Sequence, residues 1–270
     1  MRRAVGSAGA APRRAIRRLA GAALVWLGLV APGGAASDPP GAAAPCRALV
    51  HDGASYTICT FRADRDDIRL WHSDGEGALL GSFRAVDTLL RGEGRRLLFA
   101  MNGGMYHEDR APVGHFVAEG VERARLVEGD GPGNFGLLPN GVFCWGPEGA
   151  AVLETGAYAA ARPACRYATQ SGPMLVIDGA LHPRFLPASD SVHVRNGVGV
   201  AADGVTVHFA ISEERVNFHA FGRLFRDGLG VPDALYLDGK VSRLYAPGLG
   251  RADIGWPMGP IVGVAAPLDE

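Results

Sequence analysis

A carboxylate at the end of an apolar segment is the feature of this chain that points most directly to chemistry. Residues 236–242 are Tyr-Leu-Asp-Gly-Lys-Val-Ser, and they continue an apolar run that begins at Ala234. A buried strand would give Asp238 a rigid base, and Gly239 would let the backbone turn or let a ligand approach closely. An aspartate at a strand end often only caps a turn, so Asp238 is a catalytic candidate only in company with other polar groups. Gly239 and Ser242 are the nearest candidates for binding substrate.

Three further polar clusters flanked by glycine are candidates for the other polar groups of such a site. They are Asn102-Gly103-Gly104, Gln170-Ser171-Gly172-Pro173 and Arg195-Asn196-Gly197. The first follows an apolar run, Leu97–Met101, and its glycines would allow backbone N–H groups to face a ligand. The alternative for each cluster is an ordinary turn. We predict that the substrate-binding residues are Asn102, Gly103, Gly104, Gln170, Ser171, Gly172 and Asn196.

Arg195 is the candidate for holding an anion. A guanidinium group matches phosphate or carboxylate oxygens in bidentate geometry, so we predict a catalytic role for Arg195 in clamping phosphate. His193 would face the same side of an extended chain, because side chains two residues apart share a face. The ordinary alternatives are a surface ion pair for Arg195 and a partly buried surface position for His193.

Several well-known sites are excluded by the residues around their signatures. Gly197-Val198-Gly199 begins like a dinucleotide-binding fingerprint, but a hairpin rather than a helix is expected after it. The chain has neither a Gly-x-Ser-x-Gly elbow nor a lysine-containing phosphate loop. The acidic run at residues 64–67 lacks the remainder of a calcium-binding loop.

One helix must position the candidate carboxylate. Asn217 can cap it, Phe218, Phe221, Leu224 and Phe225 follow a 3.6-residue period, and glycines at 228 and 230 end it. It connects a strand that ends at Ser212 to the strand before Asp238. A strand–helix–strand unit favours a right-handed parallel crossover, with ligands at the carboxyl ends of its strands. We therefore expect Ser212, a further candidate for binding substrate, at the same sheet edge as Asp238.

Most of the remaining chain has the pattern of short strands. A second helix is expected over residues 82–90, with Ser82 as its cap. Apolar runs at 113–118, 135–138 and 142–145 are separated by glycine, proline or Asn-Gly, and the Asn140-Gly141 pair is a hairpin signal. The fold class is α+β: a strand-rich single domain with a large mixed β-sheet and two or three helices.

The N-terminus has the composition of a secretory signal peptide. Six arginines precede an apolar segment, Leu19–Ala31, and small residues end at Ala36. We predict a signal peptide over residues 1–36, a disordered lead-in over 37–45 and a folded domain over 46–270. The apolar segment is shorter than the roughly 18 residues of a membrane span, so no stable membrane anchor is expected. The product would be periplasmic or secreted, by the Sec route or, given the paired arginines, the twin-arginine route.

Removing that peptide makes the chain mildly acidic. The 27 basic residues fall to 21 against 28 acidic ones, a net charge of −7. Such a protein lacks the electrostatic footprint of nucleic-acid binding.

Four cysteines, Cys46, Cys59, Cys144 and Cys165, indicate disulfides in an exported protein. Three pairings are possible. We favour the sequential one, Cys46–Cys59 and Cys144–Cys165, because each pair brackets a short strand–turn–strand stretch. Zinc is the rival, but the chain has no Cys-x-x-Cys and its histidines are scattered, so no metal and no cofactor are predicted.

The clusters together resemble the phosphodiester glycosidase family. The resemblance extends from about Leu97 to Val264 and lies in six short stretches in the expected order. These are FAMNGGMY (99–106), PVGHFVAEG (112–120), GNFGLLPNGVF (133–143), TQSGPMLVIDG (169–179), RNGVGVAADG (195–204) and ALYLDGKVSRLY (234–245). Carried over to this chain, the resemblance implies site positions at Asn102, Gly103, Arg195, Asp238, Gly239 and Ser242. In the last of these stretches, the animal branch of the family has a sequence that resembles Leu-Asp-Gly-Gly-Gly-Ser. This chain has Lys240 and Val241 in place of the last two glycines, and this bulkier pair is expected to narrow the pocket or change its charge.

The resemblance implies hydrolysis of the bond between an anomeric carbon and a phosphate oxygen. The expected partner is then a sugar phosphodiester or polysaccharide substrate, in the envelope or in extracellular polysaccharide. Two alternatives remain open on the residues alone. The same cleft could belong to a non-catalytic periplasmic binding module for anionic saccharides, or the enzyme could cut the phosphorus–oxygen bond instead.

Overall fold

Strands dominate the part of the chain that the structure describes. The computed structural model describes residues 44–129, 131, 133–238 and 241–269. Contacts group Ala43–Glu270 as one compact unit. The predicted signal peptide and residues 37–43 of the lead-in lie outside the described residues. No helix within the described ranges combines the length and apolar character that a membrane crossing requires.

The first sheet has seven strands and carries the candidate carboxylate. Its order is β1 (Cys46–His51), β2 (Ala54–Arg62), β13 (Thr206–Ser212), β12 (Asn196–Val200), β14 (Asp233–Asp238), β10 (Met174–Ile177) and β11 (Ala180–Leu181). Every pair of neighbours in it is antiparallel.

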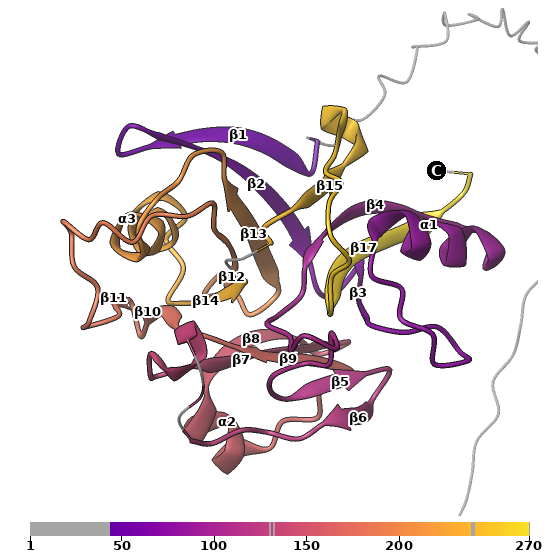
Figure 1. The fold of residues 1–270 in the computed structure, drawn as a ribbon, viewed down its shortest axis with the longest axis horizontal. Helices are drawn as coiled ribbons and strands as arrows, with labels where there is room; N and C mark the ends of the chain where they lie inside the picture. Colours follow the sequence, from indigo (N-terminus) through magenta and orange to yellow (C-terminus); the bar gives the residue numbers. More distant parts are fainter. Residues whose placement is uncertain (1–43, 130, 132, 239–240, 270) are drawn as a thin grey trace, which may run out of the picture. The chain divides into compact units, whose positions relative to one another are not determined.

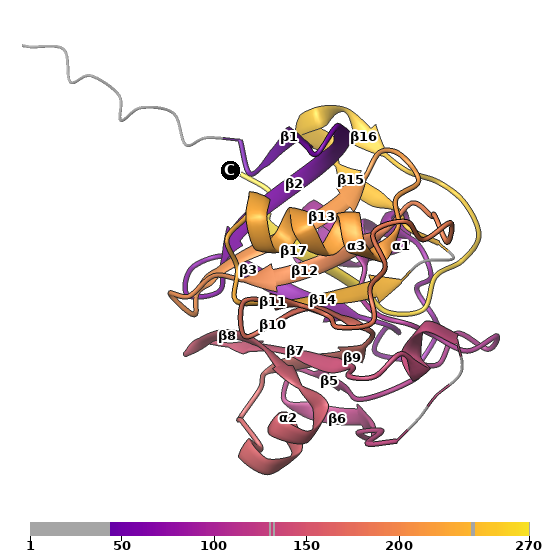
Figure 2. The same ribbon diagram turned by 90° about the vertical axis from the view of Figure 1, so that its left-hand side faces the viewer.

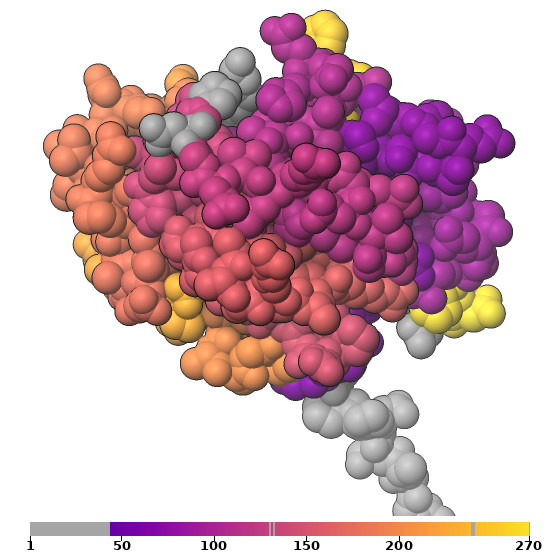
Figure 3. Space-filling model, turned by 90° about the horizontal axis from the view of Figure 1, so that it is seen from below, coloured from indigo at the N-terminus to yellow at the C-terminus, as the bar shows by residue number. Residues whose placement is uncertain are grey.

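Two five-stranded antiparallel sheets complete the strands. The second sheet has the order β16 (Arg251–Ala252), β15 (Leu244–Ala246), β4 (Arg95–Asn102), β17 (Ile261–Pro267) and β3 (Asp67–Trp71). The third has the order β6 (Val121–Ala124), β5 (Phe116–Ala118), β9 (Tyr167–Ser171), β7 (Gly141–Gly146) and β8 (Gly149–Glu154). Together with α2 (Thr155–Ala161), the third sheet occupies the middle of the face in Figure 3.

The three sheets enclose one core, and helices cover the outer faces (Figure 1). Aromatic rings from each sheet meet in that core: Phe99 lies 5.0 Å and Phe143 5.9 Å from Phe209, centroid to centroid. On the other side of the first sheet, α3 (Phe218–Arg223) and the π-helical turn η2 (Leu224–Gly228) bury Phe221 and Phe225. The helix α1 (Phe83–Gly92) packs on the second sheet, and α2 packs on the third. Short 3₁₀ turns lie at η1 (Gly133–Gly136) and η3 (Pro247–Leu249).

The α+β class is confirmed, but in place of the one large mixed sheet that we expected, the strands divide among three antiparallel sheets. Both β13 and β14 pair antiparallel with β12, so they run in the same direction with β12 between them. The predicted crossover through α3 therefore joins two like-directed strands that are not neighbours. Asn196 at the start of β12 pairs with Ile211 on one side and Asp238 on the other, which places Ser212 and Asp238 at one edge of the sheet.

Two local expectations differ from the structure. Residues 135–138, expected as a strand, begin inside the 3₁₀ turn η1, in which Phe135 is buried, and continue as a bend after it. The helix α2 was not expected, because its sequence Thr-Gly-Ala-Tyr-Ala-Ala-Ala lacks an apolar period and buries only Thr155 and Tyr158. Its start is fixed instead by Glu154, whose carboxylate accepts a hydrogen bond from the backbone N–H of Ala157 at 3.0 Å.

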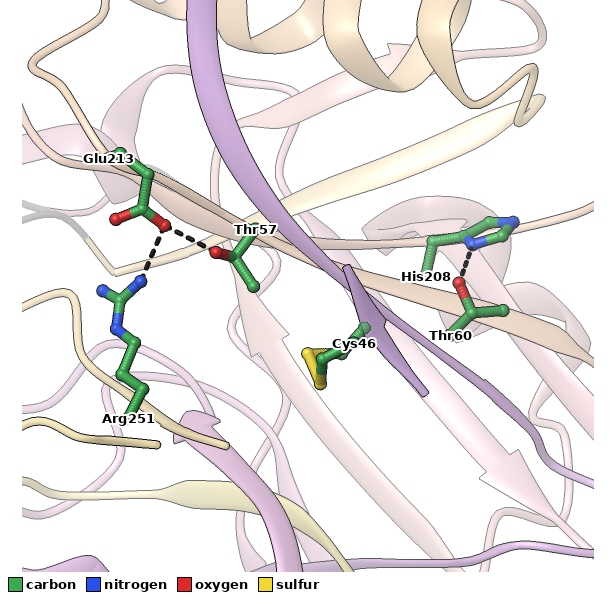
Figure 4. The surroundings of a disulfide bond; sticks show 7 residues. Cys46, Thr57, Thr60, His208, Glu213 and Arg251 are labelled. Carbon is green, nitrogen blue, oxygen red and sulfur yellow. Dashed lines mark hydrogen bonds and ion pairs between the residues drawn. A yellow bond between two sulfur atoms is a disulfide. The ribbon is translucent and has the colours of Figure 1, made fainter. Parts of the chain in front are cut away.

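The sequential disulfide pairing is confirmed. Cys46 and Cys59 are direct partners across the β1–β2 ladder and are bonded to each other (Figure 4). Cys144 in β7 is bonded to Cys165, which precedes β9. Two disulfides are typical of a protein that folds outside a reducing cytosol.

The lowered pKa values of buried histidines allow us to predict how the folding stability changes with pH. Burial lowers the pKa of His115 and of His182 below the ordinary value. The unfolded chain, whose histidines titrate near about 6.5, then takes up protons more readily than the folded chain. Folding stability should be fully present above about pH 6.5 and should decrease as pH falls from there through the lowered values.

Melting temperatures measured between about pH 7.5 and about pH 5.5 test this expectation. A flat profile over that interval would contradict it. His182→Gln should reduce the slope, because it removes one of the histidines whose pKa is lowered in the folded chain.

Candidate active site

Asp238 is held at the end of β14 by hydrogen bonds from separate parts of the fold. Asn102 Nδ2 donates to its Oδ2 at 3.4 Å, and its backbone N–H donates to Asn196 Oδ1 at 3.0 Å. Ser242 Oγ donates to the Asp238 carbonyl at 3.0 Å and lies 2.9 Å from the carbonyl of Val194. The carboxylate residue is only 7% exposed, so these bonds fix its direction in a site largely shielded from water.

Four of the predicted site residues are therefore brought together. Asn102 is the last residue of β4 in the second sheet, and its carbonyl accepts a bond from Asn196 Nδ2 at 3.5 Å. Asn102, Asn196, Asp238 and Ser242 form one connected network that joins the second sheet to the first. Gly239, predicted beside them, lies outside the described residues, as does Lys240.

A cavity of about 720 Å³ opens in front of Asp238. That volume suits a ligand of one or two sugar rings with a phosphate. Val241, which stands where the animal branch of the family resembles glycine, is one of its lining residues. The cavity is lined by Met105, Tyr106, His107, Val113, Gly133, Asn134, Phe135, His193, Asp238 and Val241.

The charged and phenolic groups near the cavity shift one another's pKa values. Burial raises the pKa of Tyr106, the negative charge of Asp238 adds to that increase, and Arg243 and Arg110 oppose it. Burial, followed by the positive charges of Arg195 and Arg215, lowers the pKa of His193. His193 thus faces the cavity as a neutral imidazole at neutral pH.

Arg243 is a cation whose pKa responds to the charge of Asp238, and we did not predict it as a site residue from the sequence. It is 7% exposed, and burial lowers its pKa while Tyr106, Asp253 and Asp238 oppose that change. Its backbone N–H donates to Asn102 Oδ1 at 2.8 Å, and Nη2 donates to the carbonyl of Trp256. Arg243, Tyr106 and Asn134 all lie within the stretches that carry the family resemblance, which is the signal that could have found them.

Arg195 occupies a position different from the predicted contact with phosphate. It is completely buried, with Nε donating to the carbonyl of Val216 and Nη2 to that of Ser191, both at 2.8 Å. Its guanidinium lies 3.6 Å from the ring centre of Phe218 in α3 and 5.4 Å from that of Tyr236. Arg195 is accordingly not among the residues that line the cavity. Ser212, also predicted at the site, is equally buried and accepts the backbone N–H of Arg195 at 2.9 Å.

The cluster at residues 170–172 supports the fold rather than lining the cavity. Gln170 Oε1 accepts N–H groups of His115 and Val127, and its Nε2 donates to the Val127 carbonyl at 2.7 Å. Ser171 Oγ donates to the carbonyl of Leu237 at 2.8 Å, the residue before Asp238. A Cβ on Gly172 would lie 2.6 Å from Asn140 Cβ, so close packing explains this glycine. These residues thus brace β14 from the third sheet.

Close packing also explains Gly103, whose N–H does not face a ligand. That N–H donates to the carbonyl of Pro260 at 2.8 Å, and Thr169 Oγ1 donates to the Gly103 carbonyl at 2.7 Å. Gly104 has a φ of +151° and would place a Cβ 2.6 Å from Thr169 Oγ1. Both glycines let the chain after Asn102 pass tightly between the second and third sheets.

Gly103→Ala should therefore destabilise the fold. A Cβ there would lie 2.8 Å from Val262 N and 2.9 Å from Leu70 Cδ1, and overpacking of this kind costs about 1–3 kcal/mol. Gly75→Ala is the control, because no atom lies within 4 Å of its Cβ position. Urea denaturation of both variants makes the comparison, and equal midpoints would contradict the packing role.

The comparisons with known proteins agree with this geometry. A family model described as phosphodiester glycosidase matches residues 95–261. The uncharacterized protein YigE of Escherichia coli strain K12 is 32% identical over 208 residues, covering 77% of this chain and 78% of that protein.

Two solved structures share the fold. The catalytic domain of zebrafish N-acetylglucosamine-1-phosphodiester alpha-N-acetylglucosaminidase, described as auto-inhibited by pro-peptide, has a TM-score of 0.54 at 14% identity, covering 81% of each chain. A hypothetical protein from Synechocystis has a TM-score of 0.53 at 13% identity, covering 82% of this chain and 61% of that one. At such identities these likenesses concern the fold alone.

Proposed function

This chain belongs to the phosphodiester glycosidase family, and from that premise we propose that it is an exported hydrolase of sugar-1-phosphodiesters. Its substrate would be a saccharide of the cell envelope or of extracellular polysaccharide. The bond that breaks joins the anomeric carbon to the bridging oxygen. Water supplies the hydroxyl of the released sugar, and the bridging oxygen leaves with the phosphate monoester.

The observation that carries the proposal is the setting of Asp238. The carboxylate of Asp238 accepts a bond from Asn102, its backbone is held by Asn196, and it lies on the wall of a cavity of about 720 Å³. Arg243 and Tyr106 are close enough for their pKa values to respond to its charge. A negative group on the cavity wall thus has a positive group close enough to respond to its charge.

This arrangement suits a phosphate leaving group. Hydrolysis of an ordinary glycoside needs a carboxylic acid with a raised pKa to protonate an alkoxide. A phosphate monoester departs as a stable anion, so positive charge and N–H or O–H dipoles replace that acid. We assign Asp238 to the sugar side, where its charge stabilises the oxocarbenium-like transition state, and Arg243 with Tyr106 to the phosphate side. Asn134 and His193 are placed to hydrogen-bond sugar hydroxyls or phosphate oxygens.

Export is supported by two features of the chain. The two disulfides fit an oxidising compartment. Residues 1–36 have the basic, apolar and small-residue order of a secretory signal.

The test is an assay of residues 37–270 against a panel of sugar-1-phosphodiesters in ¹⁸O-labelled water. Release of free sugar carrying the label supports cleavage at the anomeric carbon. Label in the phosphate product would mean cleavage of the phosphorus–oxygen bond. Binding of the panel without any release would favour the saccharide-binding module instead.

A further inference from the structure

The segment between β16 and β17 presents two large apolar side chains to solvent. Ile254 is 94% exposed and Trp256 is 83% exposed, and Trp256 is the most exposed aromatic residue of the described chain. Single exposed apolar residues are common on protein surfaces. Two of them in one loop, separated by a single residue, need a further explanation, because burying an indole would stabilise the fold.

The segment is anchored, so its exposed side chains are not a sign of a loose loop. At its start, Leu244 N donates to Asp253 Oδ2 at 2.9 Å. At its end, Met258 is buried and its N–H donates to the carbonyl of Gly81 at 2.8 Å. Between these points a Cβ on Gly255 would lie 3.1 Å from Arg243 Cζ. The backbone of the segment is therefore held against the rest of the domain, while the side chains of residues 254 and 256 are exposed to solvent.

The same anchors join the segment to the candidate active site. Arg243 Nη2 donates to the carbonyl of Trp256, and the Arg243 backbone is bonded to Asn102, which holds Asp238. A Cβ on Gly259 would lie 2.5 Å from Tyr106 Cβ, so the end of the segment backs a wall of the cavity. In Figure 2 the loop after β16 and the carboxyl end of β14 both lie toward the right-hand side.

We propose that Trp256 is a stacking platform for a sugar ring of the substrate beyond the ring that is cleaved, so that this protein acts on oligomeric or polymeric glycan phosphodiesters. The proposal rests on the proposed function for the class of substrate. One face of a pyranose carries C–H groups that pack on an indole, and a tryptophan side chain, with only two rotatable bonds, loses little entropy when it binds. Ile254 widens the apolar surface beside it.

A membrane surface fits the segment less well. Attachment to anionic lipid depends on lysine or arginine near the inserted residues. The segment Asp253–Met258 carries one carboxylate and no basic side chain.

The experiment compares Trp256→Ala with the wild type and with Val50→Ala, which removes a 69% exposed side chain on the edge strand β1. Two substrates share the cleaved sugar, one with a methyl group on the phosphate and one with an oligosaccharide there. Trp256→Ala should raise KM for the long substrate about tenfold with kcat nearly unchanged and leave the methyl substrate unaffected. Trp256→Phe should recover part of the loss. Equal effects on both substrates, or none, would overturn the platform.

A binding arm separates failure of this inference from failure of the proposed function. Chito- and cello-oligosaccharides of increasing length are titrated calorimetrically into the wild type and the Trp256→Ala variant. If no substrate is hydrolysed, oligosaccharide binding that weakens about tenfold in the variant still supports the platform. Unchanged affinity overturns it. A tryptophan emission shift with phosphatidylglycerol vesicles, and none with oligosaccharides, would assign the segment to a membrane and also overturns it.

Discussion

Replacing Asp238 by asparagine is expected to lower turnover of a sugar-1-phosphodiester by at least about 100-fold, the usual scale for losing a catalytic carboxylate. The substitution keeps the shape of the side chain while removing its negative charge. Asparagine can still accept the bond from Asn102 Nδ2, so the melting temperature should change little. Initial rates of sugar release, measured together with thermal unfolding, give both quantities.

Asp178→Asn is the matched control for this result. Asp178 also ends a strand of the first sheet, just after β10, and its φ of 48° is one that asparagine tolerates. We expect this variant to keep wild-type turnover. An Asp238→Asn variant with near-normal rates would remove Asp238 from the mechanism.

Arg243→Gln is expected to have the second-largest effect, about a 100-fold loss of kcat/KM on phosphodiesters. Its cause is the loss of positive charge on the side of the departing phosphate. An aryl glycoside of the same sugar carries no phosphate for Arg243 to stabilise, so its hydrolysis should suffer at least about tenfold less. Comparing the two substrates on one variant separates the phosphate role from a general loss of structure.

Two further variants make the arginine result interpretable. Arg243→Lys keeps the charge but loses the planar fork, and it should retain more activity than the glutamine variant. Arg91→Gln removes an exposed guanidinium that pairs with Asp87 on α1, and it should be silent. Equal losses on the phosphodiester and the aryl glycoside would count against the phosphate role.

The position of Asp238 could be predicted from the sequence because its signals are local. An apolar run, a carboxylate and a glycine specify a strand end, and the period of Phe218, Phe221 and Phe225 specifies the helix before it. The disulfide pairing was predictable for a similar reason, since each pair joins cysteines close in sequence, 13 and 21 residues apart, although the second pair also encloses the helix α2.

The orientation of the arginines could not be predicted in this way. Arg195 and Asn196 are adjacent, yet Asn196 bonds to Asp238 whereas Arg195 is enclosed by Phe218 and Tyr236 under α3. Side chains of neighbouring residues in a strand point to opposite faces, and which face meets the cavity depends on long-range pairing. The division into three sheets could not be predicted for the same reason. The residues near Ser212 and Asp238 do not indicate that β12 lies between their two strands.

The bonds around residues 237 and 238 come from all three sheets: Asn102 from the second, Asn196 from the first and Ser171 from the third. A fragment that lacks one of the sheets would lose one of these hydrogen bonds. The site around Asp238 therefore requires all three sheets. Recovery of catalysis during refolding should accordingly lag behind the earliest secondary structure and coincide with the final docking of the sheets.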